Sequence, residues 1–362
     1  MERRDFIKSA SAAAGLAVAA PVLAQAGHTS KESPIQRAQS PDMIYRELGT
    51  TGEKVSAIGL GGFHLGKDPN STPLEMVKLV RSAIDHGIDF MDNCWDYNDG
   101  ISEVRMGNAL KDGYRQKVFL MTKLDGRTEK EYNKQLEQSM GRLNTDVIDL
   151  VQFHEILRFE DPDRIFAEDG AIHAAIKARQ AGKIRFIGFT GHKNPAIHLQ
   201  MFKVAQQHNF KFDTVQMPIN VMDAHFRSFL HDVVPVAQKA GTGVLGMKSM
   251  ADGYILRSNT VTPVDAMHFS LSQPISVLIT GMENEANLTQ ALDLARNFKP
   301  ITAERTEAIL AKTREAALTG QYEPFKTSSI FDGTANNPKW LGGSSGTKLK
   351  PSSPKTEEKR VG

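Results

Sequence analysis

The sequence predicts an α/β protein built as one eight-stranded (β/α)8 (TIM) barrel, and three observations support this. Short apolar segments alternate with longer helix-like segments, as they do when helices connect parallel strands. The pattern repeats eight times within about 240 residues, which favours a closed barrel over a doubly wound open sheet. The part of the chain expected to be ordered, residues 43–342, also has a length within the range of this fold.

The expected strands are short, and several are continuous apolar runs, as is typical of parallel strands buried on both faces. They are Val55–Gly61, Asp89–Asn93, Val118–Lys123, Ile148–His154, Ile184–Thr190, Thr214–Pro218, Gly243–Met247 and Val277–Gly281. Before them, the segment Met43–Leu48, the Gly/Thr turn at 49–52 and the residues from Val55 onward predict a β-hairpin cap on the barrel floor.

The expected helices have apolar residues three and four positions apart. They are Pro73–His86, Glu103–Lys111, Glu129–Leu143, Gly170–Ala181, Pro195–His208, Phe229–Ala240, Pro263–Ser270 and Glu285–Asn297. Gly87, Gly182 and Gly241 follow three of them, where glycines commonly end helices. After the last unit, Thr302–Leu318 predicts a C-terminal helix, and Gly320–Leu341 predicts an ordered tail lying on the domain.

The N-terminus, residues 1–26, has the features of a twin-arginine (Tat) signal peptide. Arg3 and Arg4 precede a weakly apolar stretch from Ala10 to Leu23, and Ala24-Gln25-Ala26 is a small-x-small cleavage pattern. The apolar stretch is too short to span a membrane stably. The sequence therefore predicts the Tat export machinery as a partner and a periplasmic location. Residues 27–42 are interpreted as a linker, and residues 343–362 as a disordered tail.

Composition limits the possible functions. The 44 basic and 42 acidic residues give a net charge of +2, and no dense basic block points to nucleic acid. Cys94 is the one cysteine, so an intrachain disulfide and an iron–sulfur cluster are both excluded. The eleven histidines show no metal-binding spacing on a convincing helix, and no metal is expected.

Four titratable residues follow the ends of three neighbouring strands, at the face where such barrels carry their active sites. They are Asp92, Tyr97, Lys123 and His154. A phenol is a poor acid at neutral pH, and a nearby ammonium ion would lower its pKa. A carboxylate keeps that ammonium ion charged, and a neutral imidazole can donate a hydrogen bond to a carbonyl oxygen. The set suits proton donation during hydride delivery to a carbonyl carbon.

With these four residues in register, the sequence resembles the aldo/keto reductase family from the hairpin to about residue 300. The resemblance implies NAD(P)H-dependent reduction of a small carbonyl substrate, with Tyr97 as the catalytic acid assisted by Asp92 and Lys123, and with His154 orienting the carbonyl oxygen. It implies no nucleophilic role for Cys94, which is expected to pack as a small residue. Trp95 either walls the substrate pocket or packs on its rim.

The resemblance also implies a cofactor lying across the strand ends. The family usually has Ser-Asn after the fifth strand, where this chain has Thr190, Gly191 and His192. Acidic residues after the eighth strand weaken the family's habitual preference for NADP, so the cofactor is NAD or NADP with a slight preference for NADP. The expected cofactor-binding residues are Gly61, Gly62, Phe63, Thr190, His192, Gln216, Met247, Lys248, Gly281, Glu283 and Asn284.

Two other functions remain open at this stage. A dinucleotide-binding redox sensor or accessory subunit that does not turn over could use the same fold. An unrelated barrel isomerase or hydrolase would need paired carboxylates or a metal cage at the rim, and the sequence offers neither. Asp96, Glu103 and Glu155 have no assigned role, and Glu155 is expected to point away from His154 if the strand continues.

Overall fold

The structure is a computed structural model that describes residues 37, 39–67 and 71–343. The expected signal peptide, residues 1–26, lies outside the described residues, as do most of the linker and all of the expected tail except Gly343. Within the described part of the chain, no helix is both long and apolar enough to cross a membrane.

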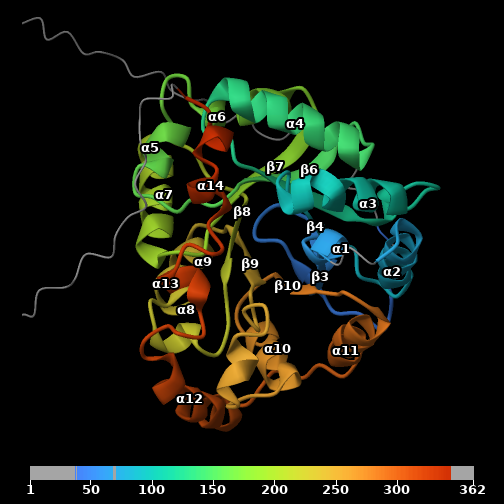
Figure 1. Cartoon of the computed structure of the whole chain (residues 1–362), viewed down its shortest axis with the longest axis vertical. Coiled ribbons are helices and arrows are strands. Elements are labelled where there is room, and N and C mark those ends of the chain that lie inside the picture. The colour runs from blue at the N-terminus through green and yellow to red at the C-terminus, as the bar shows by residue number, and fades with distance from the viewer. Residues whose placement is uncertain (1–36, 38, 68–70, 344–362) are drawn as a thin grey trace, which may run out of the picture.

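Eight parallel strands form a closed barrel with helices around it, which confirms the expected fold class (Figure 1). Around the barrel the strands follow the order β10-β3-β4-β5-β6-β7-β8-β9. Their bounds are β3 Ile58–Gly61, β4 Phe90–Asp92, β5 Phe119–Leu124, β6 Ile148–Phe153, β7 Ile184–Thr190, β8 Thr214–Pro218, β9 Gly243–Met247 and β10 Val277–Gly281. The carboxyl ends of all eight strands therefore meet at one rim.

The first expected strand, Val55–Gly61, is wrong as a single element. Lys54–Ser56 form β2, which pairs antiparallel with β1 (Tyr45–Glu47), and the barrel strand β3 begins only at Ile58. The break follows Ser56, whose main-chain N–H donates to Asp89 Oδ1 at 2.7 Å instead of continuing a ladder. Leu48 and Val55 pack against Phe90, Phe119 and other interior residues near the strand starts. The hairpin therefore caps the barrel floor, as expected.

The helices largely follow the expected ones. Phe229–Ala240 is an exception, because the structure divides it into α8 and α9, and two short helices, α1 and α5, were not expected. The bounds are α1 His64–Lys67, α2 Pro73–Asp85, α3 Ile101–Ala109, α4 Glu129–Leu143, α5 Asp161–Ile165, α6 Ala171–Gln180, α7 Pro195–Gln207, α8 Phe229–Asp232, α9 Val234–Lys239, α10 Pro263–Leu271 and α11 Glu285–Arg296.

After the last barrel unit, the described chain up to residue 343 returns over the domain (red in Figure 1). It contains α12 Ala303–Ala317, α13 Pro324–Thr327, α14 Gly333–Asn336 and a 3-10 turn at Pro338–Leu341. Lys326 anchors it, because this fully buried ammonium group contacts Asp223 at 2.6 Å and Glu323 at 3.0 Å. The C-terminal segment, residues 320–343, is thereby held against the rim of the barrel.

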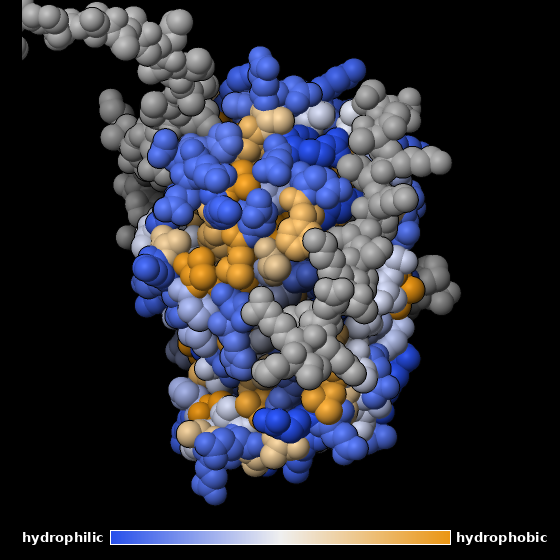
Figure 2. All heavy atoms as spheres, turned by 90° about the vertical axis from the view of Figure 1, so that its left-hand side faces the viewer, coloured by the Kyte–Doolittle hydropathy of each residue, from blue (hydrophilic) through white to orange (hydrophobic). Residues whose placement is uncertain are grey.

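The hydrophobic core has three parts. The largest part lies between the strands and the surrounding helices, and a second part fills the barrel, where the rings of Phe90, Phe119 and Phe186 stack 5.3 and 6.0 Å apart. The third part joins the loops after β8 and β9 to α10, α12 and α13. The face shown in Figure 2 is mostly hydrophilic, with hydrophobic side chains in small groups between charged ones. Because side chains fill the barrel interior, the ends of the strands are where a ligand can bind.

Candidate active site

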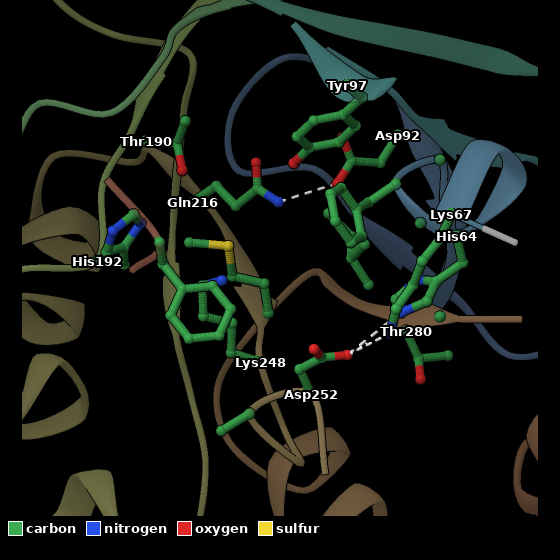
Figure 3. A pocket seen from close by; sticks show the side chains of 18 of the residues that line it. His64, Lys67, Asp92, Tyr97, Thr190, His192, Gln216, Lys248, Asp252 and Thr280 are labelled. Atoms are coloured by element: carbon green, nitrogen blue, oxygen red, sulfur yellow. Dashed lines mark hydrogen bonds and ion pairs between the residues drawn. The ribbon is translucent and has the colours of Figure 1, made fainter. Parts of the chain in front are cut away.

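A cavity of about 670 Å³ opens at the carboxyl ends of the strands. This volume lies within the range of small-molecule and cofactor sites. Its lining comes from all eight strand ends or the loops after them, together with Ile330, Phe331, Gly333 and Asn336 of the C-terminal segment. Figure 3 shows Tyr97, Asp92 and Gln216 gathered at one end of the cavity, and His64, Lys67 and Asp252 at another. All four expected catalytic residues line this cavity.

Lys123 is the centre of the candidate catalytic cluster, which consists of Asp92, Tyr97, Lys123 and His154. Its side chain is almost completely buried, and its ammonium group forms an ion pair with Asp92 and donates to the Asn93 carbonyl oxygen at 2.8 Å. The same ammonium group donates to Tyr97 Oη at 3.1 Å. The edge of the His154 ring meets the Tyr97 ring, with 6.0 Å between the centroids. The structure thus brings together the four side chains that the sequence placed on three separate strand ends.

The protonation of Tyr97 differs from the expectation. Burial raises the pKa of this phenol well above its usual value, and the negative charge of Asp92 raises it further. The expectation that Lys123 lowers this pKa is therefore wrong, because desolvation and the surrounding acids outweigh the ammonium group. At neutral pH Tyr97 is a protonated phenol that accepts from Lys123 and can donate its own proton.

His154 is enclosed on one side by other titratable groups. Its Nδ1 lies 2.9 Å from Asp125 Oδ1, 3.3 Å from Cys94 Sγ and 3.6 Å from Asp96 Oδ1. Burial lowers the pKa of this imidazole, although Asp96 opposes the shift. Since Asp125 and Cys94 are fully buried, Nδ1 faces the protein interior, and the opposite ring nitrogen, Nε2, is the one left toward the cavity.

Cys94 is a packed thiol. It has no solvent exposure, and burial raises its pKa well above the usual value, so the reactive thiolate is disfavoured. Its Sγ, one oxygen of Asp96 and Nδ1 of His154 lie within 4.8 Å of one another, which makes them the one candidate metal-ligand group among the described residues. Nδ1, however, is already hydrogen-bonded to Asp125. We therefore interpret Cys94 and Asp96 as polar neighbours of His154 and not as metal ligands.

Gln216 presents an unused acceptor to the cavity. Its amide nitrogen donates to Asp92 Oδ2 at 3.1 Å, whereas its buried Oε1 has no partner in the described part of the protein. Thr190, which is paired with Gln216 across β7 and β8, also lines the cavity. A buried acceptor without a partner costs free energy, so a ligand N–H group would be bound favourably here. This arrangement fits the carboxamide of a nicotinamide ring.

The backbone comes close to the cavity at two expected glycines. A Cβ on Gly62 would lie 2.5 Å from the Asp92 carbonyl oxygen, and a Cβ on Gly281 would lie 2.3 Å from the His64 ring. Neither position has room for a side chain. Lys248 reaches the cavity from a left-handed residue (φ 57°), and its ammonium group lies 4.9 Å from the centre of the Phe331 ring. A cation here suits a phosphate oxygen of a dinucleotide.

Charged side chains bridge the cavity at the end opposite Tyr97. Lys67 on α1 contacts Asp252, in the loop after β9, at 2.8 Å, and Glu283, after β10, at 3.4 Å (Figure 3). His64 lies 3.5 Å from Glu283. The Asp252 carboxyl has a lowered pKa because His64 and Lys67 favour its charged form. Three loops are thus tied together over this end of the cavity.

His192 lies between the cavity and the C-terminal segment. It lines the cavity, but its Nε2 lies 3.1 Å from Asp332 Oδ1 of the C-terminal segment. Burial lowers the pKa of this imidazole to about 4, so it is neutral at pH 7. Lys193 contacts the other Asp332 oxygen at 2.8 Å. His192 therefore helps to hold the C-terminal segment, and its expected contact with the cofactor stays a prediction.

Glu155 also fixes the C-terminal segment. The residue adopts a left-handed conformation (φ 47°), which ends β6 and turns the carboxylate into the site instead of away from it. Its two oxygens accept from the main-chain N–H groups of Gly333 at 3.0 Å and Thr334 at 2.7 Å. The opposite direction was expected only if the strand continued past His154, and β6 ends at Phe153.

The other expected cofactor residues, with one exception, line the same cavity. Asn284 does not, because its side chain accepts from Asn287 N–H and caps α11. Sequence reasoning missed several lining residues that lie in the loop after β9, in α1 and in the C-terminal segment. The length of the loop that contains Gly253 could have indicated some of them, because this loop is longer than a tight β–α turn. The missed residues include His64, Lys67, Asn98, Glu155, Asp252, Asn287, Ile330, Phe331 and Asn336.

The closed parallel barrel and the Tyr, Lys, Asp and His residues at its carboxyl rim define a class of barrel oxidoreductases. The chain belongs to the aldo/keto reductase family, whose family model matches residues 57–311. Members of this family use NAD(P)H in carbonyl reduction, and several named relatives are oxidoreductases.

Curated relatives agree with this assignment. L-galactose dehydrogenase of Arabidopsis thaliana is 32% identical over 229 residues, which are 58% of this chain and 66% of that protein. The uncharacterized oxidoreductase YrpG of Bacillus subtilis is 27% identical over 307 residues, covering 76% of this chain and 91% of its own length. The chain thus spans slightly less than two thirds of the first of these relatives.

Solved structures of reductases share the fold. The holo form of aldo-keto reductase AKR11C1 from Bacillus halodurans superposes with a TM-score of 0.61 at 23% identity, covering 75% of this chain and 96% of that one. The thermostable aldo-keto reductase Tm1743 gives the same TM-score and identity, and all of its chain is covered.

Proposed function

We propose that the protein reduces aldehyde or ketone groups of small molecules with NADH or NADPH, and that Tyr97 donates the proton. The observation that carries this proposal is the contact of 3.1 Å between Lys123 Nζ and Tyr97 Oη, in a buried cluster with Asp92. A phenol that is protonated at neutral pH and lines the cavity can donate its proton to a substrate carbonyl oxygen.

A bound nicotinamide would supply the hydride, and the protein side chains would supply the rest of the chemistry. Tyr97 gives its proton to the carbonyl oxygen as negative charge develops there, and Lys123 stabilises the phenolate that remains. Asp92 keeps Lys123 charged and orients Gln216 through the bond of 3.1 Å. Gln216 Oε1 and Thr190 would hold the carboxamide, and Lys248 a phosphate oxygen.

The direct test is the consumption of NADH and of NADPH by the purified protein with a panel of carbonyl compounds. The panel includes simple aldehydes, ketones, quinones and aldoses, and the oxidation of sugars is assayed with NAD and NADP, because one relative is named L-galactose dehydrogenase. Multiple turnovers support the proposal. Tight cofactor binding with at most one turnover supports the alternative of a dinucleotide-binding sensor.

The charged bridge predicts how the cofactor preference can be changed. Glu283 lines the cavity with 48% of its side chain exposed, and acidic residues after the last strand disfavour a 2′-phosphate. We expect Glu283→Lys to lower the Kd for NADPH about tenfold, about 1.4 kcal/mol, and to leave the Kd for NADH nearly unchanged. Fluorescence titration with each cofactor measures both constants.

Glu285→Lys is the matched control, because it makes the same charge change two residues later, on α11 and outside the cavity lining. We expect this control to change the NADPH affinity much less. Equal effects of the two variants would show that the preference follows net charge alone and that Glu283 has no specific position next to the cofactor.

We also propose that the protein is exported by the Tat machinery and acts in the periplasm, on the strength of Arg3, Arg4 and the apolar stretch after them. The test is cell fractionation of the full chain and of a variant with both arginines changed to lysine. Accumulation of the variant in the cytoplasm with its N-terminus uncleaved is the expected result. Equal fractionation of the two proteins would contradict the proposal.

A further inference from the structure

Asp125 faces His154 from the buried side of the site. It follows the end of β5 and has no solvent exposure, and its Oδ1 lies 2.9 Å from His154 Nδ1. The main-chain N–H groups of Asp125 and Gly126 both donate to Gln135 Oε1 of α4, each at 2.8 Å. A Cβ on Gly126 would lie 2.6 Å from the Tyr132 nitrogen, so the turn is also closely packed. The carboxyl group is therefore held firmly against the imidazole.

The proton in the Asp125–His154 bond determines what the other ring nitrogen can do. A neutral imidazole has one N–H group and one acceptor nitrogen. When Asp125 is ionised, Nδ1 must donate to it, and Nε2 presents a lone pair to the cavity. When Asp125 is protonated, it donates to Nδ1, and Nε2 carries the proton. Only the second form of the neutral ring can donate to a substrate carbonyl oxygen.

We propose that Asp125 is a positioning residue that selects the tautomer of His154 and so decides whether Nε2 donates to a carbonyl oxygen or accepts from an alcohol hydroxyl. This inference rests on the proposed function of the site. The protonated pair suits reduction. Loss of one proton to solvent gives the carboxylate with an Nδ1–H ring, and this form suits alcohol oxidation. The two forms differ by one proton and by no other bond.

The surroundings keep both groups of the pair close to their neutral forms. Burial raises the pKa of Asp125 to about 7 and lowers the pKa of His154, so a protonated acid beside a neutral ring is favoured over an ion pair. Arg127 and Lys123 favour the carboxylate. Other titratable and charged groups face Asp125 and His154. They are Cys94, Asp96 and Tyr97 after β4, Lys123 in β5, Arg127 after β5, and Glu155 after β6.

The inference predicts opposite pH profiles for the two directions of the reaction. Below about pH 7 the pair holds two protons and Nε2 donates, and above it Nε2 accepts. We expect kcat/KM for reduction to fall at least about tenfold from about pH 6 to about pH 8.5, and kcat/KM for oxidation to rise over the same interval. Asp125→Asn cannot titrate, so both steps should disappear from its profiles, whereas they should persist in Glu155→Gln, which removes the other carboxyl group of the site with a pKa of about 7. Tyr97 does not produce them, because its raised pKa lies well above this interval.

Cys94→Ala is the matched control. It removes another group in contact with Nδ1, at 3.3 Å, but leaves the carboxyl group in place, so its profiles should keep both steps. Steps that persist in Asp125→Asn, or that vanish equally in Cys94→Ala, would overturn the inference. A merely structural role of Asp125 would lower the rates at every pH without removing the steps.

A second measurement needs no enzymatic activity and reads the tautomer in the wild-type protein. Long-range 1H–15N spectra of the wild-type protein with 15N-labelled histidine report which ring nitrogen is protonated, and the spectrum of a His154→Gln variant identifies the His154 signals. We expect the proton to move from Nε2 to Nδ1 as pH rises through about 7. An unchanged tautomer from about pH 5.5 to about pH 8.5 would contradict the inference. If no carbonyl compound or alcohol reacts, the proposed function fails, and the spectra still decide the role of Asp125.

Discussion

Replacement of Tyr97 by Phe should reduce carbonyl reduction by about 10²- to 10⁴-fold, the range that positioned general acids contribute. Among the described side chains that line the cavity, the Tyr97 phenol contacts Lys123 and also carries a proton at neutral pH. Removing the hydroxyl leaves the ring packed against Phe63 and His154, whose centroids lie 5.4 and 6.0 Å away. The loss should therefore appear in kcat.

Cofactor binding is the control for this variant. Gln216, Thr190 and Lys248 are untouched by the change, so the Kd of NADPH and NADH should stay within a few-fold of the wild-type values. Steady-state rates and fluorescence titration of the same preparation separate the two effects. A variant with the full wild-type rate would exclude Tyr97 as the proton donor. A variant that no longer binds cofactor would indicate a structural collapse of the pocket.

Replacement of Lys326 by Met should lower the free energy of unfolding by about 3–5 kcal/mol, because it leaves buried acids without their cation. Lys326 Nζ contacts Asp223 at 2.6 Å and Glu323 at 3.0 Å, and it donates to the Phe226 carbonyl oxygen at 2.7 Å. Burial already raises the pKa of Glu323 to about 7. Among the described residues, Asp223 forms an ion pair with Lys326 and with no other cationic side chain. Chemical denaturation measures the loss.

The same variant should also change the site, because Lys326 anchors the segment that carries Ile330 and Phe331 to the cavity. We expect a raised KM for the carbonyl substrate, in addition to the lost stability. Lys312→Met is the control, since this lysine is exposed on α12 and its loss should change stability by no more than about 0.5 kcal/mol. Equal stability of the two variants would show that the buried ion pairs do not hold the C-terminal segment.

Much of the fold could be predicted because its elements carry local signals. The strands β7 to β10 have the predicted bounds, since each is a short apolar run between polar turns. Val55–Gly61 was predicted as one strand because the run has no break in hydrophobicity. Its division coincides with hydrogen bonds between Ser56 and Asp89, 33 residues later: Ser56 N–H donates to Asp89 Oδ1, and Asp89 N–H donates to Ser56 Oγ. No local sequence pattern predicts such bonds.

The candidate site was predictable to the extent that it lies at strand ends. Asp92, Lys123 and His154 lie at the carboxyl ends of β4, β5 and β6 or directly after them, and Tyr97 follows β4 by a short turn, so the strand pattern alone places them at one rim. Glu155 was predicted to point away because alternation along a strand was assumed to continue. A single left-handed residue reverses that direction, and its carboxylate accepts from the main-chain N–H groups of Gly333 and Thr334 in the C-terminal segment.

The sequence by itself determined the barrel, its hairpin cap and the four side chains of the catalytic cluster, because hydrophobic periodicity and strand ends are local properties of the chain. Only the tertiary structure decided the protonation of Tyr97, the partner of His154 Nδ1 and the contact of His192 with Asp332. Each of these depends on burial and on charged groups distant in sequence, such as Asp332, which lies 140 residues after His192. Desolvation is a property of the packed site. A sequence pattern can therefore identify the titratable residues, but the packing around them determines their protonation.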